Sequence, residues 1–265
     1  MPRFSANLSM LFTEHDFLDR FDAAARAGFS GVEYVSPYEH PAEVVAERLA
    51  RNGLTQALFN MPAGDWAGGE RGIGCLPDRV EEFRASVDTA ISYARTLGCE
   101  RVNCLAGLAP AGVDRKVLED VFVENLRYAA PRFADAGIKL VIEAINTKVD
   151  IPGFFLNGSK QAFDIIDRVG SDNLYLQYDI YHMQVMEGDL ARTIEANLDR
   201  IQHIQIADHP GRHEPGTGEI NYPFLYDHLD RIGYDGWVGA EYRPAATTEA
   251  GLGWFRALKG TRSAA

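Results

Sequence analysis

Short apolar runs alternate with longer segments of mixed polarity from one end of the chain to the other. Each run has the length of a single β-strand, and several of the runs stop at a polar residue. The pattern predicts eight strands, over residues 4–9, 31–35, 54–59, 101–105, 138–143, 174–179, 201–206 and 237–241.

The segments between these runs place apolar residues at helical spacing. The first helix is expected to start at Thr13 and to end at Gly28, a residue type that is common just after the last turn of a helix. Another helix follows Pro77 and ends before Gly98, and a long helix precedes the fifth strand. The remaining helices are expected near residues 159–169, 189–199, 222–232 and 247–258.

Regular alternation of eight strands with eight helices is typical of an α/β chain that folds as a (β/α)8 TIM barrel. Such a barrel takes about 250 residues, and no linker, repeat or low-complexity segment divides this chain. We therefore expect a single domain over residues 1–265. The alternative is an open, doubly wound sheet with a glycine-rich turn after the first strand. Residues 8–12, at that point of the chain, contain no glycine.

Four polar side chains stand at the ends of four successive predicted strands: Glu143, Asp179, Gln205 and Glu241. Neighbouring parallel strands of a closed barrel end at the same mouth, so these side chains are expected to converge there. Three carboxylates in one pocket would repel one another without a cation between them. Hard oxygen ligands suit Mg²⁺ or Mn²⁺ better than zinc. A single acidic residue at a strand end is often a helix N-cap, but four polar residues at one edge favour a metal site.

Two residues near this mouth are candidates for binding a substrate. His182 lies three residues after Asp179, so one helical turn or a tight loop would return it to the pocket; the alternative is a structural histidine. Arg212 lies in the glycine- and proline-rich loop after the seventh strand, and it can grip a carboxylate through two parallel hydrogen bonds. The alternative is a surface pair with Glu214 or Glu219.

A third candidate, Arg71, lies in the longest irregular stretch, residues 60–77. Loops of this length in a compact domain are usually functional, and this one is expected to form a lid or a substrate wall. Trp66 in the same stretch would exclude water from the pocket or, alternatively, only pack the loop. Arg71 would then meet an anionic group.

The composition narrows the range of partners. There are 26 Lys and Arg against 38 Asp and Glu, a net charge of −12. Such a surface repels phosphate backbones, and no basic cluster appears, so no nucleic-acid partner is expected. No apolar run is long enough to span a membrane, and the amino-terminal residues do not resemble a signal peptide. Three cysteines without a CxxC pair favour a reducing cytoplasm; the sequence leaves open whether the chain forms a homo-oligomer.

Several long segments carry a resemblance to a known family. They are RFSANLSMLF, FNMPAGDWAGGERGIG, DIPGFFL, LQYDIYHMQ, HIQIADHPGRHEPGTGEINY and WVGAEYRP. Together they are similar to the hydroxypyruvate isomerases, part of the wider xylose-isomerase-like barrel superfamily. The resemblance extends over nearly the whole chain.

This resemblance implies that a small oxo-acid, hydroxypyruvate, is converted into tartronate semialdehyde (2-hydroxy-3-oxopropanoate) by metal-assisted proton transfer through an enediol. By matching motif positions, Glu143 and Glu241 would be the catalytic acid/base pair and would also touch the metal. Asp179 and Gln205 would be the remaining ligands. Sugar 3-epimerases of the superfamily usually have histidine where Gln205 stands, which favours the oxo-acid branch.

Other functions stay open on the same scaffold. The nearest are a 2-oxotetronate isomerase and a small-sugar epimerase, and a hydride shift could replace proton transfer. A metal-dependent phosphodiesterase is more distant, because it would need several metals, more histidines at the strand ends and a basic face. A non-catalytic binding barrel would not need the complete set of ligand-type residues.

Overall fold

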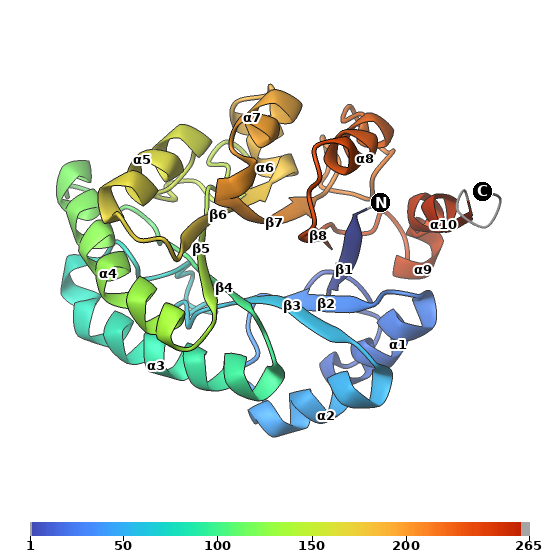
Figure 1. Cartoon of the computed structure of the whole chain (residues 1–265), viewed down its shortest axis with the longest axis horizontal. Coiled ribbons are helices and arrows are strands. Elements are labelled where there is room, and N and C mark those ends of the chain that lie inside the picture. Colours follow the sequence, from blue (N-terminus) through green and yellow to red (C-terminus); the bar gives the residue numbers. More distant parts are fainter. Residues whose placement is uncertain (1, 261–265) are drawn as a thin grey trace.

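The chain forms a closed barrel of eight parallel strands in the computed structural model, with helices around the outside (Figure 1). The structure describes residues 2–260. Neighbouring strands pair in chain order, and the last strand pairs with the first, which closes the barrel. The strands are β1 (Arg3–Asn7), β2 (Gly31–Tyr34), β3 (Thr55–Asn60), β4 (Arg101–Cys104), β5 (Lys139–Glu143), β6 (Leu174–Asp179), β7 (Ile201–Ile206) and β8 (Trp237–Ala240). The predicted (β/α)8 TIM barrel is confirmed, and so is each predicted strand.

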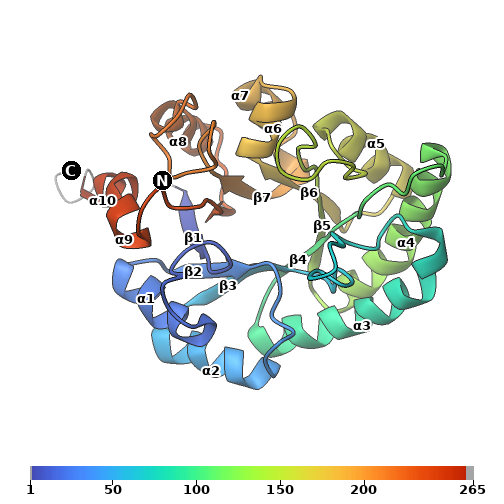
Figure 2. The same cartoon turned by 180° about the vertical axis from the view of Figure 1, so that it is seen from behind.

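Helices connect the strands and surround the barrel, as Figure 2 shows from behind. They are α1 (Arg20–Ala27), α2 (Ala42–Asn52), α3 (Val80–Leu97), α4 (Arg115–Asp135), α5 (Ser159–Val169), α6 (Ile180–Met186), α7 (Leu190–Ala196), α8 (Tyr222–Arg231), α9 (Thr248–Gly251) and α10 (Gly253–Gly260), with short 3₁₀ turns at Phe17–Asp19, Pro77–Arg79 and Leu198–Arg200. Helix α5 has the predicted bounds. The helix predicted over 247–258 is divided into α9 and α10, and α2 had no predicted bounds of its own.

The first helix begins later than predicted. Residues 13–15 form turns and bends, and a 3₁₀ turn at Phe17–Asp19 leads into α1. Contacts with the other end of the chain explain the difference. The backbone N–H of Phe12 donates to Thr248 Oγ1 at 2.7 Å, and the Glu14 carboxylate accepts from the backbone N–H of Thr248 at 2.6 Å. The segment is thereby tied to α9 instead of forming helical hydrogen bonds.

The helices cover the barrel because each carries an apolar stripe. In α5 the stripe includes Phe163, Ile165 and Ile166, which are buried against the sheet. Burying a side chain of this size contributes about 1.5–3 kcal/mol. The strands are buried on both faces, which is why they are nearly continuous apolar runs in the sequence. The strand ends therefore sit on a rigid, close-packed support.

A polar network fills part of the barrel interior. Glu33 of β2 is fully buried and accepts hydrogen bonds from Ser5 Oγ at 2.7 Å and from Gln205 Nε2 at 2.7 Å. His203 Nε2 lies 2.9 Å from the same carboxylate. Burial opposes ionisation of Glu33, but His203 and the hydrogen bonds outweigh it and lower the pKa of this carboxyl. A Cβ at Gly239 would lie 2.3 Å from both Glu33 oxygens, so the glycine leaves the room that this carboxylate occupies.

Two further predictions concern the chain as a whole. All three cysteines are unpaired and buried; for Cys99 and Cys104, beside or within an apolar run, the sequence predicts this packing role. None of the helices that the structure describes is long and apolar enough to cross a membrane.

Candidate active site

Four strand ends bring the predicted metal ligands to one mouth of the barrel. Glu143 is the last residue of β5 and Asp179 the last of β6, while Gln205 lies in β7 and Glu241 directly follows β8. All four are buried. Asp179 is paired with Gln205 across β6 and β7. The structure thus places these side chains on adjacent strands at the same edge; their role as ligands stays a prediction.

Asp179 is both a helix cap and an open acceptor. Its Oδ1 accepts from the backbone N–H groups of Tyr181 and His182, at 2.8 Å and 3.2 Å, and so caps α6. Its Oδ2 is buried and has no hydrogen-bond partner among the described residues. A buried carboxylate oxygen without a donor is costly unless a ligand pairs with it. This oxygen is therefore available to a cation.

His182 returns to the pocket through the first turn of α6, as predicted, and its ring is buried. Asn146 determines which ring nitrogen carries the hydrogen. Asn146 Oδ1 accepts from the backbone N–H groups of Val149 and Asp150, both at 3.0 Å, which fixes the orientation of the amide. Its Nδ2 then donates to His182 Nδ1 at 2.8 Å. Because Nδ1 is an acceptor, the hydrogen of the neutral ring is on Nε2.

The Nε2–H group of His182 faces the carboxylates. Nε2 lies 3.8 Å from Glu143 Oε1 and 3.6 Å from Asp179 Oδ2, and these three residues offer ligand-type atoms within 4.8 Å of one another. Burial lowers the pKa of His182 to about 4, so the ring is neutral at neutral pH. A protonated ring nitrogen donates hydrogen bonds and does not bind a cation. The geometry therefore favours His182 as a donor to a substrate oxygen rather than as a ligand.

The two glutamates are held in an environment that disfavours their charge. Glu143 Oε2 accepts from Asn103 Nδ2 at 3.0 Å, yet burial and the charges of Glu241 and Asp179 raise the pKa of Glu143 well above its usual value. Burial also raises the pKa of Glu241 to about 8, although the nearby Arg212 opposes the shift. Without a cation, the cluster tends to retain protons. A divalent cation would relieve both the burial cost and the repulsion.

Gln205 is oriented by residues beneath the pocket. Its Nε2 donates to Glu33 Oε1 at 2.7 Å, and its Oε1 accepts from Gln177 Nε2 at 2.6 Å. A carbonyl oxygen can accept twice, so one lone pair of Oε1 is left for a cation.

Arg212 lies among the carboxylates of Asp150, Asp179 and Glu241, and its side chain is buried. Its Nη1 donates to Asp150 Oδ1 at 3.0 Å, and Nη2 lies 3.4 Å from Glu241 Oε2. Burial disfavours the charge, but Glu241, Asp179 and Asp150 outweigh it and raise the pKa of Arg212. Its Nε has no hydrogen-bond partner in the described part of the chain. The backbone of Arg212 is left-handed, with φ of 56°, and such strained residues cluster at functional sites.

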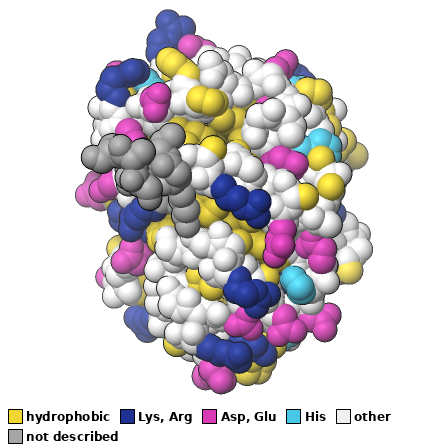
Figure 3. Space-filling view, turned by 90° about the vertical axis from the view of Figure 1, so that its right-hand side faces the viewer, with side chains coloured by type: hydrophobic (Ala, Val, Ile, Leu, Met, Phe, Trp, Pro, Cys, Tyr) yellow, Lys and Arg dark blue, Asp and Glu magenta, His cyan; other side chains and the backbone are white. Residues whose placement is uncertain are grey.

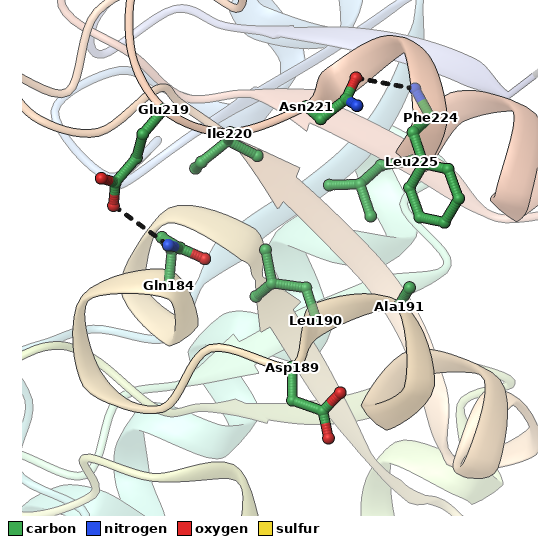
Figure 4. A pocket seen from close by; sticks show the side chains of 9 residues that line it. All are labelled: Gln184, Asp189, Leu190, Ala191, Glu219, Ile220, Asn221, Phe224 and Leu225. Carbon is green, nitrogen blue, oxygen red and sulfur yellow. Dashed lines mark hydrogen bonds between the residues drawn. The ribbon is translucent and has the colours of Figure 1, made fainter.

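The loop that carries Arg212 is fixed by its own hydrogen bonds. Asp208 Oδ2 accepts from the backbone N–H of Gly216 at 2.8 Å. Glu219 accepts from Gln184 of α6 at 3.1 Å, a contact drawn in Figure 4. The hollow shown there, about 280 Å³, lies between α6, α7 and the start of α8, and its lining includes none of the predicted site residues. The predicted alternative, a pair of Arg212 with Glu214 or Glu219, is not what the structure shows, since Arg212 pairs with Asp150.

Arg71 is not brought together with the other predicted residues. Its guanidinium stacks 4.3 Å from the centre of the Trp66 ring and donates to the backbone carbonyls of Trp66 and Glu70. Trp66 is 41% exposed and lines a hollow of about 790 Å³ formed by residues that follow β1, β2, β3 and β8. The predicted loop thus borders the mouth, while Arg71 stabilises the loop itself.

Three residues of the site were not predicted: Asn103, Asn146 and Asp150. Asn103 had a usable signal, because it is a polar residue in a strand whose end faces the same mouth. Asn146 and Asp150 lie in the irregular segment after β5, where periodicity says nothing about side-chain direction.

The closed barrel and the polar residues at its strand ends define the class of this protein. It belongs to the xylose isomerase-like TIM barrel family, which matches residues 21–258.

Individual relatives narrow the assignment. The chain is 56% identical to the hydroxypyruvate isomerase of Escherichia coli over 255 residues, which cover 96% of this chain and 98% of that protein. It is 51% identical to a 2-oxo-tetronate isomerase of Cupriavidus necator over 260 residues, covering 98% and 100%. Among solved structures, a Brucella melitensis protein described as an AP endonuclease of family 2 superposes with a TM-score of 0.94 at 48% identity, covering 97% and 99%.

Proposed function

We propose that this chain is an isomerase of small 2-oxo acids that converts hydroxypyruvate into tartronate semialdehyde. One observation carries the proposal: the cluster of site residues includes two buried polar atoms of opposite character that have no hydrogen-bond partner among the described residues. Asp179 Oδ2 is an acceptor without a donor, and Arg212 Nε is a donor without an acceptor. The first suits a cation and the second an anionic substrate. The Escherichia and Cupriavidus relatives are named as isomerases of such oxo acids, which supports the same function.

The donor set fits a hard divalent cation. We propose that Glu143, Asp179, Glu241 and the amide oxygen of Gln205 hold Mg²⁺ or Mn²⁺. When bound, the cation acts as a Lewis acid that stabilises negative charge on the substrate oxygens.

Glu143 and Glu241 are the proposed acid/base pair. Isomerisation takes a proton from C3, delivers a proton to C2 and moves a hydroxyl proton from O3 to O2, through an enediol. A glutamate placed beside the C2–C3 bond can take up a proton and release it again, and positioned acid–base catalysis of this kind contributes typically about 10²–10⁴-fold. One glutamate removes the C3 proton, and the same or the facing glutamate delivers a proton to C2. An internal hydride shift is the alternative.

The remaining residues bind and orient the substrate. His182 donates its Nε2–H to a substrate oxygen, and Arg212 binds the carboxylate with Nε and Nη2, the side of the guanidinium that does not face Asp150. Arg71 has no such role in this proposal, because its guanidinium is held in its own loop. A homo-oligomer, a cytoplasmic location and the absence of nucleic-acid and membrane partners stay predictions.

A 2-oxotetronate isomerase is the second candidate. The identity to the Cupriavidus relative is only slightly lower than that to the Escherichia relative. Both substrates carry a carboxylate beside a ketone, so the same residues would serve both.

A phosphodiesterase is less well supported, despite the description of the Brucella relative. Among the described residues, Glu143, Asp179 and His182 form the one cluster of metal-ligand type, and His182 is assigned as a donor. On the face drawn in Figure 3, basic and acidic side chains are interspersed rather than gathered into a basic area. A small-sugar epimerase is disfavoured by glutamine rather than histidine at position 205.

The test is to follow hydroxypyruvate and 2-oxotetronate by proton NMR with purified enzyme and Mg²⁺ or Mn²⁺ in D₂O. The proposal predicts formation of tartronate semialdehyde with solvent deuterium at C2, since the proton is exchanged on a glutamate. Product without deuterium would indicate a hydride shift. A kcat/KM that is much higher for 2-oxotetronate would favour the second candidate, and no conversion of either acid would contradict the proposal.

A further inference from the structure

We infer that Asp150 is a positioning residue that keeps Arg212 from closing onto the carboxylates of the metal site. Asp150 lies in the loop between β5 and α5, outside the four strand ends. This inference rests on the proposed metal site and adds a residue to it. Asp150 would keep the positively charged Arg212 away from the divalent cation.

Both carboxylate oxygens of Asp150 are occupied. Oδ1 accepts from Arg212 Nη1 at 3.0 Å. Oδ2 accepts from Tyr181 OH at 2.7 Å and from Asn146 Nδ2 at 2.6 Å. The side chain of Asp150 is only 10% exposed. Asp150 is therefore held firmly and can act as a fixed anchor for a guanidinium.

Arg212 stands between this anchor and the proposed ligands. Its Nη2 lies 3.4 Å from Glu241 Oε2 and 3.9 Å from Asp179 Oδ2. Strong charged hydrogen bonds are about 2.7–2.9 Å long, so neither contact is a full hydrogen bond. The contact with Asp150 is the shortest of the three. Both contacts are long ion pairs, and a small movement of the guanidinium would shorten them to charged hydrogen bonds.

The same carboxylates attract both cations, so Arg212 and a divalent ion compete for them. Asp150 balances the charge of Arg212 locally and holds it at the edge of the pocket. Without the Asp150 carboxylate, Arg212 is expected to pair with Glu241 and Asp179. This movement would weaken metal binding and also withdraw the guanidinium from the substrate.

A double-mutant cycle on Mn²⁺ binding tests the inference. Metal-free wild-type protein, Asp150→Asn, Arg212→Ala and the double variant are titrated with Mn²⁺ by calorimetry, after thermal unfolding has verified that each is folded. We expect Asp150→Asn to weaken binding by about tenfold or more, as is typical when a group supporting a metal site is lost. In the Arg212→Ala background the same change is expected to have little effect, because the competing guanidinium is gone. Arg212→Met replaces Arg212→Ala if the alanine variant does not fold.

Two control variants separate the effect of Asp150 on Arg212 from the loss of one negative charge and from the loss of one hydrogen bond to Asp150. Glu187→Gln also removes one carboxylate charge. Glu187, at the end of α6, accepts hydrogen bonds from Ser159 and has no contact with Arg212 among those that the structure shows. Tyr181→Phe removes one hydrogen bond to Asp150 and leaves its charge. Both are expected to bind Mn²⁺ nearly as wild-type protein does.

Two results would overturn the inference. The first is an Asp150→Asn variant with wild-type affinity for Mn²⁺. The second is an equal loss of affinity in both backgrounds, which would mean that Asp150 acts on the metal site without Arg212. The titration uses no substrate, so its outcome is independent of which acid is isomerised. A wild-type protein that binds no Mn²⁺ would instead contradict the metal site of the proposed function.

Discussion

At the scale of single residues, Asp179 uses its two oxygens for two purposes. One oxygen caps α6, and the other is buried without a hydrogen-bond partner among the described residues. The sequence presents the roles of helix cap and metal ligand as alternatives. The two oxygens of Asp179 make both roles compatible in one side chain. The cap also fixes the first turn of α6 and so determines where His182 lies.

The sequence could predict that polar residues at strand ends form the site. It could not predict which loop residues form hydrogen bonds with the other site residues. Glu143, Asp179 and Glu241 interrupt apolar runs, and the barrel geometry then dictates that they share one mouth. Asp150 and Asn146 lie in a segment whose path depends on tertiary contacts. The orientation of Arg212 depends on Asp150, so the sequence could not predict that orientation either.

The first prediction concerns the acid/base pair. Glu143→Gln and Glu241→Gln each keep the shape of the side chain but remove a base, so each should lower turnover at saturating metal by at least about a hundredfold. The measurement is kcat with hydroxypyruvate, and Glu187→Gln is the control for loss of a carboxylate elsewhere. Near-normal turnover in either variant would remove that residue from the pair.

The second prediction concerns recognition of the substrate carboxylate. Arg212→Lys keeps the charge but loses the two-pronged geometry, so kcat/KM for hydroxypyruvate should fall. Arg212→Ala should lower it further, by about 1.5–3 kcal/mol of transition-state binding. A neutral hydroxyketone should be much less affected. Equal losses for both substrates would mean that Arg212 supports the loop and that the carboxylate is held elsewhere.

At the scale of elements, β8 is shaped by a side chain of another strand. Gly239 leaves space for Glu33 of β2, and Glu33 in turn orients Gln205 of β7. The apolar runs predicted all eight strands because burial of both faces leaves a clear pattern. They could not predict this network, since nothing in the pattern of β2 indicates which strand its one carboxylate faces.

The third prediction follows from that close packing. Gly239→Ala places a methyl group against the Glu33 carboxylate and should lower the free energy of unfolding by about 1–3 kcal/mol, as overpacking does. Gly253→Ala is a matched control, because its added Cβ meets nothing within 4 Å. Denaturant unfolding of both variants provides the measurement. An equal effect of the two substitutions would contradict the packing seen around Glu33.

The beginning of α1 shows a limit of local patterns. A helix start at Thr13 is reasonable from nearby residues alone, but the other end of the chain binds that segment through Thr248. Contacts between residues so far apart in sequence leave no periodic signal.

At the scale of the whole molecule, the barrel gathers negative charge at one mouth of an already acidic chain. Glu143, Asp179 and Glu241 face inward with Arg212 as the nearby cation, and Asp150 already pairs with that cation. Burial raises the pKa of Glu143 and of Glu241, so these two carboxyls resist ionisation in the metal-free protein. The proposed divalent cation would complete the charge balance of this cluster.

The central claim is that a divalent cation bound at this mouth makes the protein an isomerase of a small oxo acid. Its most direct test is the turnover of hydroxypyruvate by protein that has been stripped with a chelator and verified to be free of metal, before and after addition of Mg²⁺ or Mn²⁺. We expect stripping to abolish turnover and either ion to restore it. Full activity in the metal-free protein would show that no divalent cation is needed.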